Sequence, residues 1–140
     1  MNFSAPHKTA IARTRLSAPA RLLSEAGLLV GNVLDFGCGH GTDAEILDIC
    51  KYDPHFFPAE PPWHRWDTVM CNYVLNVVSP RMAAGIIWEV ETHLLRAGGR
   101  AYFAVRRDMK NADKNRQRLV KLSLPVLHEE AGFCIYETWK

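Results

Sequence analysis

Residues 33–43 read Val-Leu-Asp-Phe-Gly-Cys-Gly-His-Gly-Thr-Asp, and this stretch decides the fold. A short apolar run reaches Asp35, three glycines then alternate with other residues, and a helix-compatible segment follows from Thr42. The pattern predicts a β-strand, a glycine turn and the start of an α-helix. Glycine adopts positive φ angles and has no Cβ atom, so we expect a ligand to lie against the main chain of this turn.

The spacing of the glycines separates two classes of nucleotide site. Dinucleotide folds favour Gly-x-Gly-x-x-Gly, whereas this turn is Gly-x-Gly-x-Gly with a carboxylate two residues before its first glycine. A carboxylate there would repel a pyrophosphate and attract a cationic amino-acid group. S-adenosylmethionine, with its α-ammonium and sulfonium, therefore suits Asp35 better than NAD does. The alternative is an ordinary glycine-rich turn between a strand and a helix.

The turn resembles motif I of the class I S-adenosylmethionine-dependent methyltransferases, with Asp35, Gly37, Gly39 and Gly41 at the matching positions. The resemblance implies S-adenosyl-L-methionine as the cofactor. The expected cofactor-binding residues are Asp35, Phe36, Gly37, Cys38, Gly39, Gly41, Asp53, Pro54 and Asn72.

A second acidic residue follows at the distance that such a fold needs. Asp53 lies eighteen residues after Asp35, at the end of a short strand-like run. This is close to the interval of about 20 residues at which a second strand presents a carboxylate to ribose hydroxyls. The flat apolar surface of residues 54–57 (Pro-His-Phe-Phe) would pack against adenine. An Asp-Pro turn with two core phenylalanines is the alternative.

Length and composition indicate one domain over residues 1–140, with a basic leader and helix (1–27) followed by a cofactor-binding core (32–140). No run of 18 apolar residues and no secretory signal is present, so we expect a cytoplasmic protein without membrane contact, as a monomer or weak homodimer. The four cysteines form no Cys-x-x-Cys pair, and the six histidines have no zinc-ligand spacing. The sequence thus predicts reduced cysteines and no metal site.

Basic residues concentrate in two segments. Residues 1–22 hold four basic and no acidic side chains, and residues 96–121 hold nine basic against two acidic. If both segments lie beside the cofactor site, they would attract RNA or DNA. A solvated basic face without a partner is the alternative.

Patterning along the chain predicts the remaining elements. We expect a helix over 19–25, strands over 32–36, 49–52, 67–73 and 100–105, a helix over 42–47, a longer helix from Pro80 with an apolar stripe that includes Met82 and Ile86, and a closing hairpin formed by 119–127 and 133–139. The proline-rich residues 53–67 cannot hold the usual third strand with its flanking helices. The expected fold is α/β: a trimmed Rossmann-like methyltransferase sandwich with a mostly parallel sheet and a C-terminal antiparallel hairpin. Because ligands of such sheets sit at the carboxyl ends of the strands, we expect Asp35, Asp53, Asn72 and Arg106 on one rim.

Candidates for the chemistry follow the strand of residues 67–73. Methyl transfer is an in-line displacement that needs a positioned nucleophile and the handling of one proton. In the family that the chain resembles, this strand faces the methyl group, which makes Asn72, Tyr73 and Asn76 the catalytic candidates. A helix cap and a core aromatic are the alternatives for Asn76 and Tyr73. The Asn-Tyr-Val-Leu stretch lacks the two prolines of the enzymes that methylate base amino groups.

Charged side chains provide the substrate-binding candidates. Arg106 and Arg107 end the next strand and would grip a phosphate or carboxylate, unless they are merely a solvated strand end. His7 and Lys8 would fold over the cofactor, although a frayed terminus is the common alternative.

Over about half of its length the chain is similar to small bacterial and phage methyltransferase-like proteins. The similar pieces are the leader, motif I, YDPHFFP, CNYVLNVV and AYFAVRRD. Similar leader and CNYVLNVV-like elements occur in methyltransferase-like proteins associated with DNA phosphorothioation. We therefore expect a methyltransferase with a weak preference for nucleic acid. The alternatives are a small-molecule methyltransferase, with a pocket lined by Trp63, Trp66 and Tyr73, and a non-catalytic cofactor-binding module.

Overall fold

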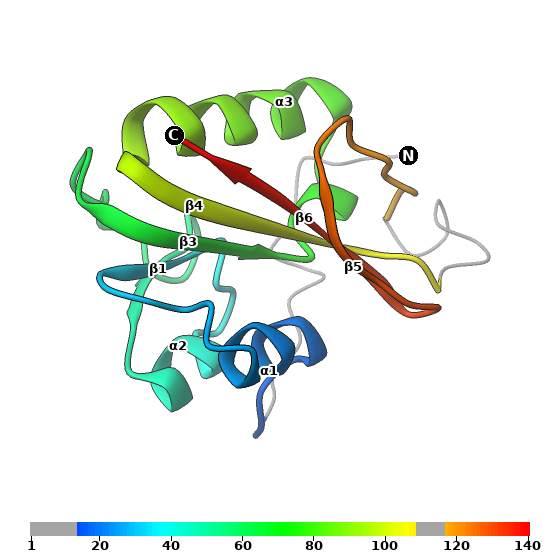
Figure 1. Cartoon of the computed structure of the whole chain (residues 1–140), viewed down its shortest axis with the longest axis horizontal. Helices are drawn as coiled ribbons and strands as arrows, with labels where there is room; N and C mark the ends of the chain where they lie inside the picture. The colour runs from blue at the N-terminus through cyan, green and yellow to red at the C-terminus, as the bar shows by residue number, and fades with distance from the viewer. Residues whose placement is uncertain (1–13, 109–116) are drawn as a thin grey trace.

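A six-stranded mixed sheet forms the centre of the computed structural model, which describes residues 14–108 and 117–140 (Figure 1). The strand order is β2-β1-β3-β4-β6-β5. The strands are β1 (Val33–Phe36), β2 (Cys50–Tyr52), β3 (Trp66–Asn72), β4 (Leu95–Arg106), β5 (Val126–Glu129) and β6 (Phe133–Trp139). The first four in this order are parallel, and β6 pairs antiparallel with both β4 and β5. The expected mostly parallel sheet with a C-terminal antiparallel pair is confirmed.

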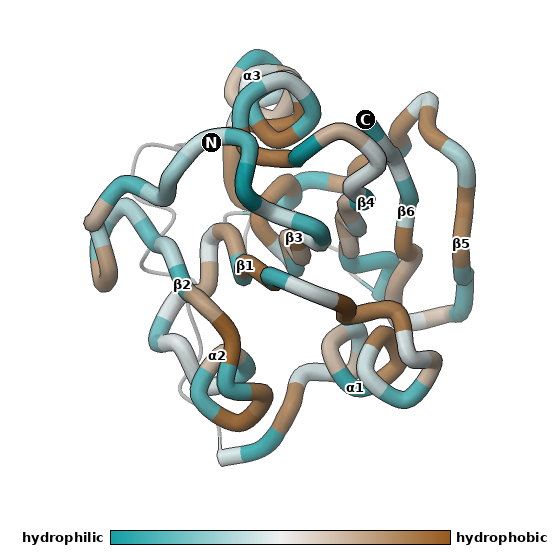
Figure 2. Tube along the Cα trace, turned by 60° about the vertical axis from the view of Figure 1, so that its left-hand side comes forward, coloured by the Kyte–Doolittle hydropathy of each residue, from teal (hydrophilic) through white to brown (hydrophobic). Residues whose placement is uncertain are grey.

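Helices cover both faces of this sheet. Figure 2 shows α1 (Ala18–Glu25) and α2 (Thr42–Leu47) on one side of the strands and α3 (Pro80–Glu89) on the other. Ser17 caps α1, because its side chain accepts a hydrogen bond from the backbone N–H of Ala20. A 3₁₀ turn (Leu75–Val77) precedes α3, and a π-helical turn (Val90–Leu94) follows it.

Alternation along the strands sorts the side chains into two cores. Val69 and Cys71 of β3 pack toward α3, whereas Met70 packs with Ala20 and Leu23 of α1. Both faces of β3 are therefore buried around its centre, which explains the uninterrupted apolar run over residues 69–71.

The predicted helix over 42–47 is confirmed with the same bounds. No strand lies between β2 and β3 in the described structure, where Asp53 and Phe57 form only an isolated bridge. The prolines of this segment account for that absence, as expected.

Two expected boundaries need correction. β4 begins at Leu95 rather than Arg100 and runs through Gly99, where a Cβ atom would lie 2.8 Å from the carbonyl oxygen of Trp66. The first hairpin strand begins only at Val126. Met82 does not join the core, because 52% of its surface is exposed.

No helix within residues 14–108 and 117–140 is long and apolar enough to cross a membrane.

Candidate functional site

A cavity of about 600 Å³ lies at the carboxyl ends of β1 to β4. Ligands of open α/β sheets bind at this edge. Asp35, Asp53, Asn72 and Arg106 all line the cavity, so the expectation that they share one rim is confirmed. Further lining residues come from the glycine turn, from the starts of α1 and α2, and from α3.

Backbone hydrogen bonds hold the glycine turn that follows β1. Gly37, Gly39 and Gly41 have φ angles of 77°, 58° and 82°. The N–H groups of Gly37 and Cys38 donate to the carbonyl oxygen of Tyr52 at 2.8 and 3.0 Å. The turn is therefore fixed against the end of β2, and its positive φ angles explain the need for glycine.

Gly37 corrects one expectation about this turn. A Cβ atom added there would lie 2.4 Å from Cγ2 of Val74. The space that the missing side chain leaves is thus filled by Val74, and the close approach at Gly37 is made by the protein's own side chain rather than by a ligand.

Asp35 is the buried carboxylate at the base of the cavity. It is 2% exposed, and none of the described residues donates a hydrogen bond to its side chain. Burial, with a further contribution from the nearby Asp43 and Asp53, raises the pKa of Asp35 from 3.8 to about 8. A cationic group in the cavity would supply the missing partner and favour the ionised form.

Asp53 and Asp43 differ from Asp35 because both have partners. The Asp53 carboxylate accepts hydrogen bonds from the backbone N–H groups of Gly39, His55 and Phe56, each at 3.0 Å. It therefore ties the glycine turn to the loop after β2, with one acceptor site left of about four for the predicted ribose contact. Asp43 accepts from the backbone N–H and the hydroxyl of Ser17 at 2.8 and 2.7 Å, and so joins the N-termini of α1 and α2.

Asn72 carries an unpaired amide in the cavity. Its Oδ1 and Nδ2 are both buried, and neither has a hydrogen-bond partner among the residues that the structure describes. The strand register places Asn72 opposite Ala104, on the sheet face of Asp35 and Met70. A buried amide without partners costs about 1–3 kcal/mol, which a ligand that both donates and accepts would offset.

Tyr73 also lines the cavity, with φ at 63° and its N–H donating to the carbonyl oxygen of Ala104 at 2.8 Å. A positive φ is uncommon for tyrosine, and here it turns the chain at the end of β3 toward the 3₁₀ turn before α3.

Asn76 does not line the cavity, which corrects its assignment as a catalytic candidate. It is 0% exposed, its Oδ1 accepts from the backbone N–H of Arg106 at 2.8 Å, and its Nδ2 donates to the carbonyl oxygen of Arg118 at 2.9 Å. Its amide therefore joins the end of β4 to the segment before β5. The role is structural.

Replacing Asn76 with alanine is expected to destabilise the fold by about 2–4 kcal/mol, because two buried backbone groups lose their partners. Urea denaturation measures this change. Asn72→Ala serves as the matched control, since it removes an amide with no described partner and should change stability much less. A smaller loss for Asn76→Ala than for Asn72→Ala would contradict the structural role.

The two arginines that end the β4 region lie on opposite faces of the sheet. Arg106 lines the cavity, whereas Arg107 donates to the hydroxyl of Tyr136 at 2.8 Å on the α3 face. Consecutive residues of a strand alternate between faces, so the two could not share one ligand site. Arg107 is therefore corrected as a substrate candidate. His7 and Lys8 lie outside the described residues.

Apart from Tyr73, the aromatic candidates for adenine and for an acceptor pocket lie outside the cavity. Of residues 54–57, only Pro54 lines the cavity. Phe56 packs against His40 at 4.4 Å between ring centroids, and Phe57 packs against Gly41. Trp66 is buried at the opposite end of β3, where its Nε1 donates to the carbonyl oxygen of Pro62. Trp63 is 60% exposed and stacks on His93.

Sequence reasoning missed the side of the cavity that α3 provides. Met82, Ile86 and Glu89 line it at steps of four and three residues, facing Tyr52 and Pro54 from β2 and its loop. Burial, together with the nearby Glu60 and Glu89, raises the pKa of Tyr52, consistent with Glu89 lying near this ring. The apolar stripe of this helix was visible in the sequence, but the sequence did not show that its N-terminal part lines a cavity.

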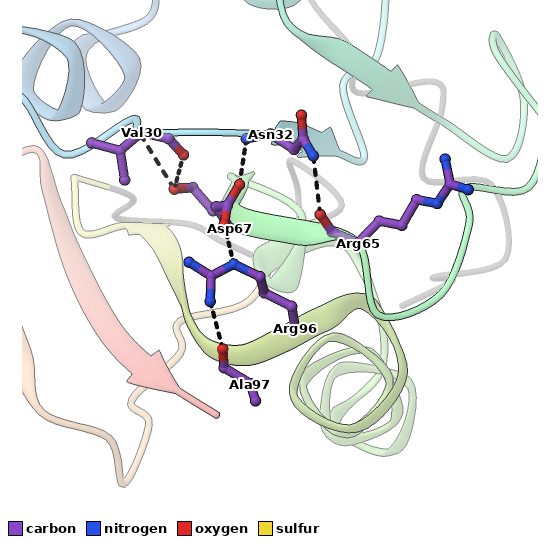
Figure 3. Close-up of polar contacts among 7 residues, drawn as sticks. Val30, Asn32, Arg65, Asp67, Arg96 and Ala97 are labelled. Carbon is purple, nitrogen blue, oxygen red and sulfur yellow. Dashed lines mark hydrogen bonds and ion pairs between the residues drawn. The ribbon is translucent and has the colours of Figure 1, made fainter.

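Two arginines of the second basic segment, Arg96 and Arg100, do not line the cavity. Arg96 pairs with Asp67, which also accepts from the backbone N–H of Asn32 at 2.7 Å (Figure 3). The hydrogen bonds from Asn32 and Arg96 lower the pKa of Asp67. Arg100 pairs with Glu137 at 2.8 Å. Arg100 precedes Arg106 by six residues of β4, which at the rise of an extended strand separates them by about 20 Å.

The four cysteines are free, and Cys50 is exposed. Burial raises the pKa of the cavity-lining Cys38 to about 12, which keeps its thiol protonated at neutral pH. No group of three metal-ligating side chains occurs within the described parts of the chain. Comparison of the sequence with protein-family models and with curated proteins gives no match.

Proposed function

We propose that this protein is an S-adenosylmethionine-dependent methyltransferase, with the cavity at the carboxyl ends of β1 to β4 as its active site. The observation that carries the proposal is the buried Asp35, which directly precedes the glycine turn, lines the cavity and has no described hydrogen-bond partner. A cationic ligand is the chemistry that such a carboxylate accepts. The unpaired amide of Asn72 on the same sheet face adds a second group that needs a ligand.

The sheet supports a Rossmann-like methyltransferase fold with its third strand missing. A parallel β2-β1-β3-β4 core, an antiparallel C-terminal pair and a glycine turn between β1 and α2 are the features on which this interpretation rests. The loss of the third strand leaves β2 at the edge of the sheet, beside the cavity.

Each side of the cavity suits one part of the cofactor. Asp35 would hold the amino-acid half, and Asp53 would hold the ribose through its remaining acceptor site. Tyr52, Met82 and Ile86 provide apolar surface for the adenine ring, and Glu89 provides an acceptor for its amino group.

The cofactor supplies a methyl group on a sulfonium: the sulfur keeps the electron pair of the broken carbon–sulfur bond, the acceptor atom forms a new bond to carbon, and the acceptor proton passes to solvent. For this in-line reaction the residues of the chain position groups and exclude water. Asn72 and Tyr73 are the candidates for orienting the acceptor atom.

Met82 provides a test that separates binding from folding. Met82→Ala is expected to leave the free energy of unfolding within about 0.5 kcal/mol, because the side chain is already 52% exposed. It should weaken the binding of S-adenosylhomocysteine about tenfold, since the lost contact area is apolar. Equilibrium dialysis with labelled ligand measures the affinity.

Leu119→Ala is the matched control, because Leu119 is 62% exposed and does not line the cavity. Equal affinities for the wild type and the Met82 variant would remove α3 from the site. An absence of any binding to the wild type at millimolar ligand would remove the proposed function.

The preference for nucleic acid depended on both basic segments lying beside the rim. Arg96 and Arg100 are paired with acidic side chains away from the carboxyl end of β4, and residues 1–13 and 109–116, which hold further basic side chains, lie outside the described part of the chain. A small-molecule acceptor is therefore the version of the proposal that the described residues favour.

A further inference from the structure

Arg106 is held at the mouth of the cavity with part of its guanidinium available. Its Nε donates to Oδ1 of Asp108 at 3.1 Å, and its side chain is 31% exposed. Its two terminal nitrogens donate to no group that the structure describes. The backbone is fixed separately, since the Arg106 N–H donates to Asn76. A guanidinium in this state is a ready partner for an oxyanion.

The strand register aims Arg106 into the same space as Asp35 and Asn72. Asp35 pairs with Met70, and Asn72 lies two residues beyond Met70. Asn72 pairs in turn with Ala104, and Arg106 lies two residues beyond Ala104. Because residues two apart share a face, the three side chains follow one another along a single face of the rim. Their order is carboxyl group, neutral amide and guanidinium.

The other charged groups of the cavity oppose a polyanion. Among the described lining residues, Arg106 is the one lysine or arginine, beside these acidic residues: Asp35, Asp43, Asp53, Glu89 and Asp108. Such a lining lowers the local concentration of nucleic acid, whose binding depends on several phosphate contacts. A single small oxyanion is repelled less by the acidic lining, because it needs one contact with Arg106 rather than several along a phosphate backbone.

We infer that the methyl acceptor is a small molecule with one oxyanionic group, a carboxylate or a phosphate, that binds the terminal nitrogens of Arg106. This inference rests on the proposed function. The amide of Asn72, one strand closer to Asp35, then faces the acceptor atom with one donor and one acceptor. Arg106 fixes the molecule at one end, and Asn72 orients the atom to be methylated.

The experiment uses the full chain saturated with S-adenosylhomocysteine, so that the acceptor half of the site is left to the probe. Succinate and inorganic phosphate are titrated in separate arms, and a twelve-nucleotide single-stranded DNA in a third. Calorimetry measures each affinity. We expect succinate or phosphate to bind, and Arg106→Gln to weaken that binding about tenfold.

Two further variants make the test independent of folding. Arg100→Gln removes a paired arginine that lies about 20 Å along β4 from Arg106, and it should leave anion binding unchanged. Asp108→Asn frees the Nε of Arg106 from a competing carboxylate and should strengthen anion binding by about threefold to tenfold. A gain of affinity cannot result from a damaged fold.

The outcomes are distinguishable. If S-adenosylhomocysteine itself does not bind, the proposed function fails. If it binds but neither anion does, or if Arg106→Gln leaves anion binding unchanged, only the inference about the acceptor fails. DNA binding tighter than both anions and lost in Arg106→Gln would overturn the small-molecule assignment. A loss of S-adenosylhomocysteine affinity in Arg106→Gln would also overturn it, because the arginine would then hold the cofactor.

Discussion

Asp35→Asn is expected to make the ligand-free protein more stable at pH 8.5 and, at the same time, unable to bind S-adenosylmethionine tightly. The wild-type protein keeps a carboxyl group that is 2% exposed and that no described residue bonds. Asparagine has the same shape and no charge to desolvate. A functional residue whose removal stabilises the fold is the pattern expected where stability is traded for binding.

The pH dependence of this effect follows from the pKa of Asp35. Its value is raised from 3.8 to about 8 in the folded state, so the folded protein binds more protons than the unfolded chain between these two values. Stability contributed by the protonated form is therefore complete at low pH and is lost as the pH rises toward about 8. The Asp35→Asn variant does not lose this stability, so the difference between its free energy of unfolding and that of the wild type should grow from pH 5 to pH 8.5.

We expect the variant to gain roughly 2–4 kcal/mol at pH 8.5, since each unit of pKa shift corresponds to about 1.4 kcal/mol and a buried amide loses part of that gain. Urea denaturation at pH 5 and pH 8.5 measures the difference. Asp48→Asn, at an exposed position with φ at 54°, is the matched control and should change stability little at either pH. A destabilised Asp35 variant at pH 8.5 would show that the carboxylate has a partner in the fold.

Gly37→Ala is expected to destabilise the fold by about 2–4 kcal/mol and to deform the glycine turn. Two costs add at this position. The φ angle of 77° strains any residue with a Cβ atom, and that atom would lie 2.4 Å from Val74. Since the turn lines the cavity, its deformation should also weaken the binding of S-adenosylhomocysteine.

Two companion variants separate these costs. Gly27→Ala has a φ of 71° with nothing within 4 Å of the added Cβ, so it should show the strain alone, about 1 kcal/mol. Combining Gly37→Ala with Val74→Ala should remove the clash and recover part of the stability. Equal losses for Gly27→Ala and Gly37→Ala in urea denaturation would show that Val74 does not fill the space beside Gly37.

Local chemistry made the first part of the fold predictable. The glycine turn and the helix of residues 42–47 follow from short-range rules: positive φ angles need glycine, and the residues after the turn favour a helix. The proline-rich segment after Asp53 likewise excluded a further strand between β2 and β3. These predictions depend on neighbours in sequence, which a sequence displays.

Predictions that depended on distant partners were less accurate. The strand was expected to begin at Arg100, yet β4 begins at Leu95 and runs through Gly98 and Gly99, because Gly99 lets the backbone pass the carbonyl oxygen of Trp66. Asn76 read as a catalytic candidate or a cap, whereas its amide joins Arg106 and Arg118. Nothing local to a residue reveals which segments will lie beside it.

The candidate site was predicted in the same uneven way. Asp35, Asp53, Asn72 and Arg106 were correctly expected on one rim, because the carboxyl ends of parallel strands meet there. Arg107 was placed beside Arg106, although strand alternation sends it to the other face. Met82 was expected only as part of an apolar stripe, since such a stripe does not reveal where the core ends and a cavity begins.

The most direct test of the central claim is a calorimetric titration of S-adenosylmethionine at pH 6.5 in two buffers that differ in ionisation enthalpy. The Asp35 carboxyl is then largely protonated before binding, because its pKa is raised to about 8. We predict binding with release of close to one proton, and a loss of both affinity and proton release in Asp35→Asn. A folded wild-type protein that binds no cofactor at millimolar concentration, or binds it equally well without Asp35, would contradict the account.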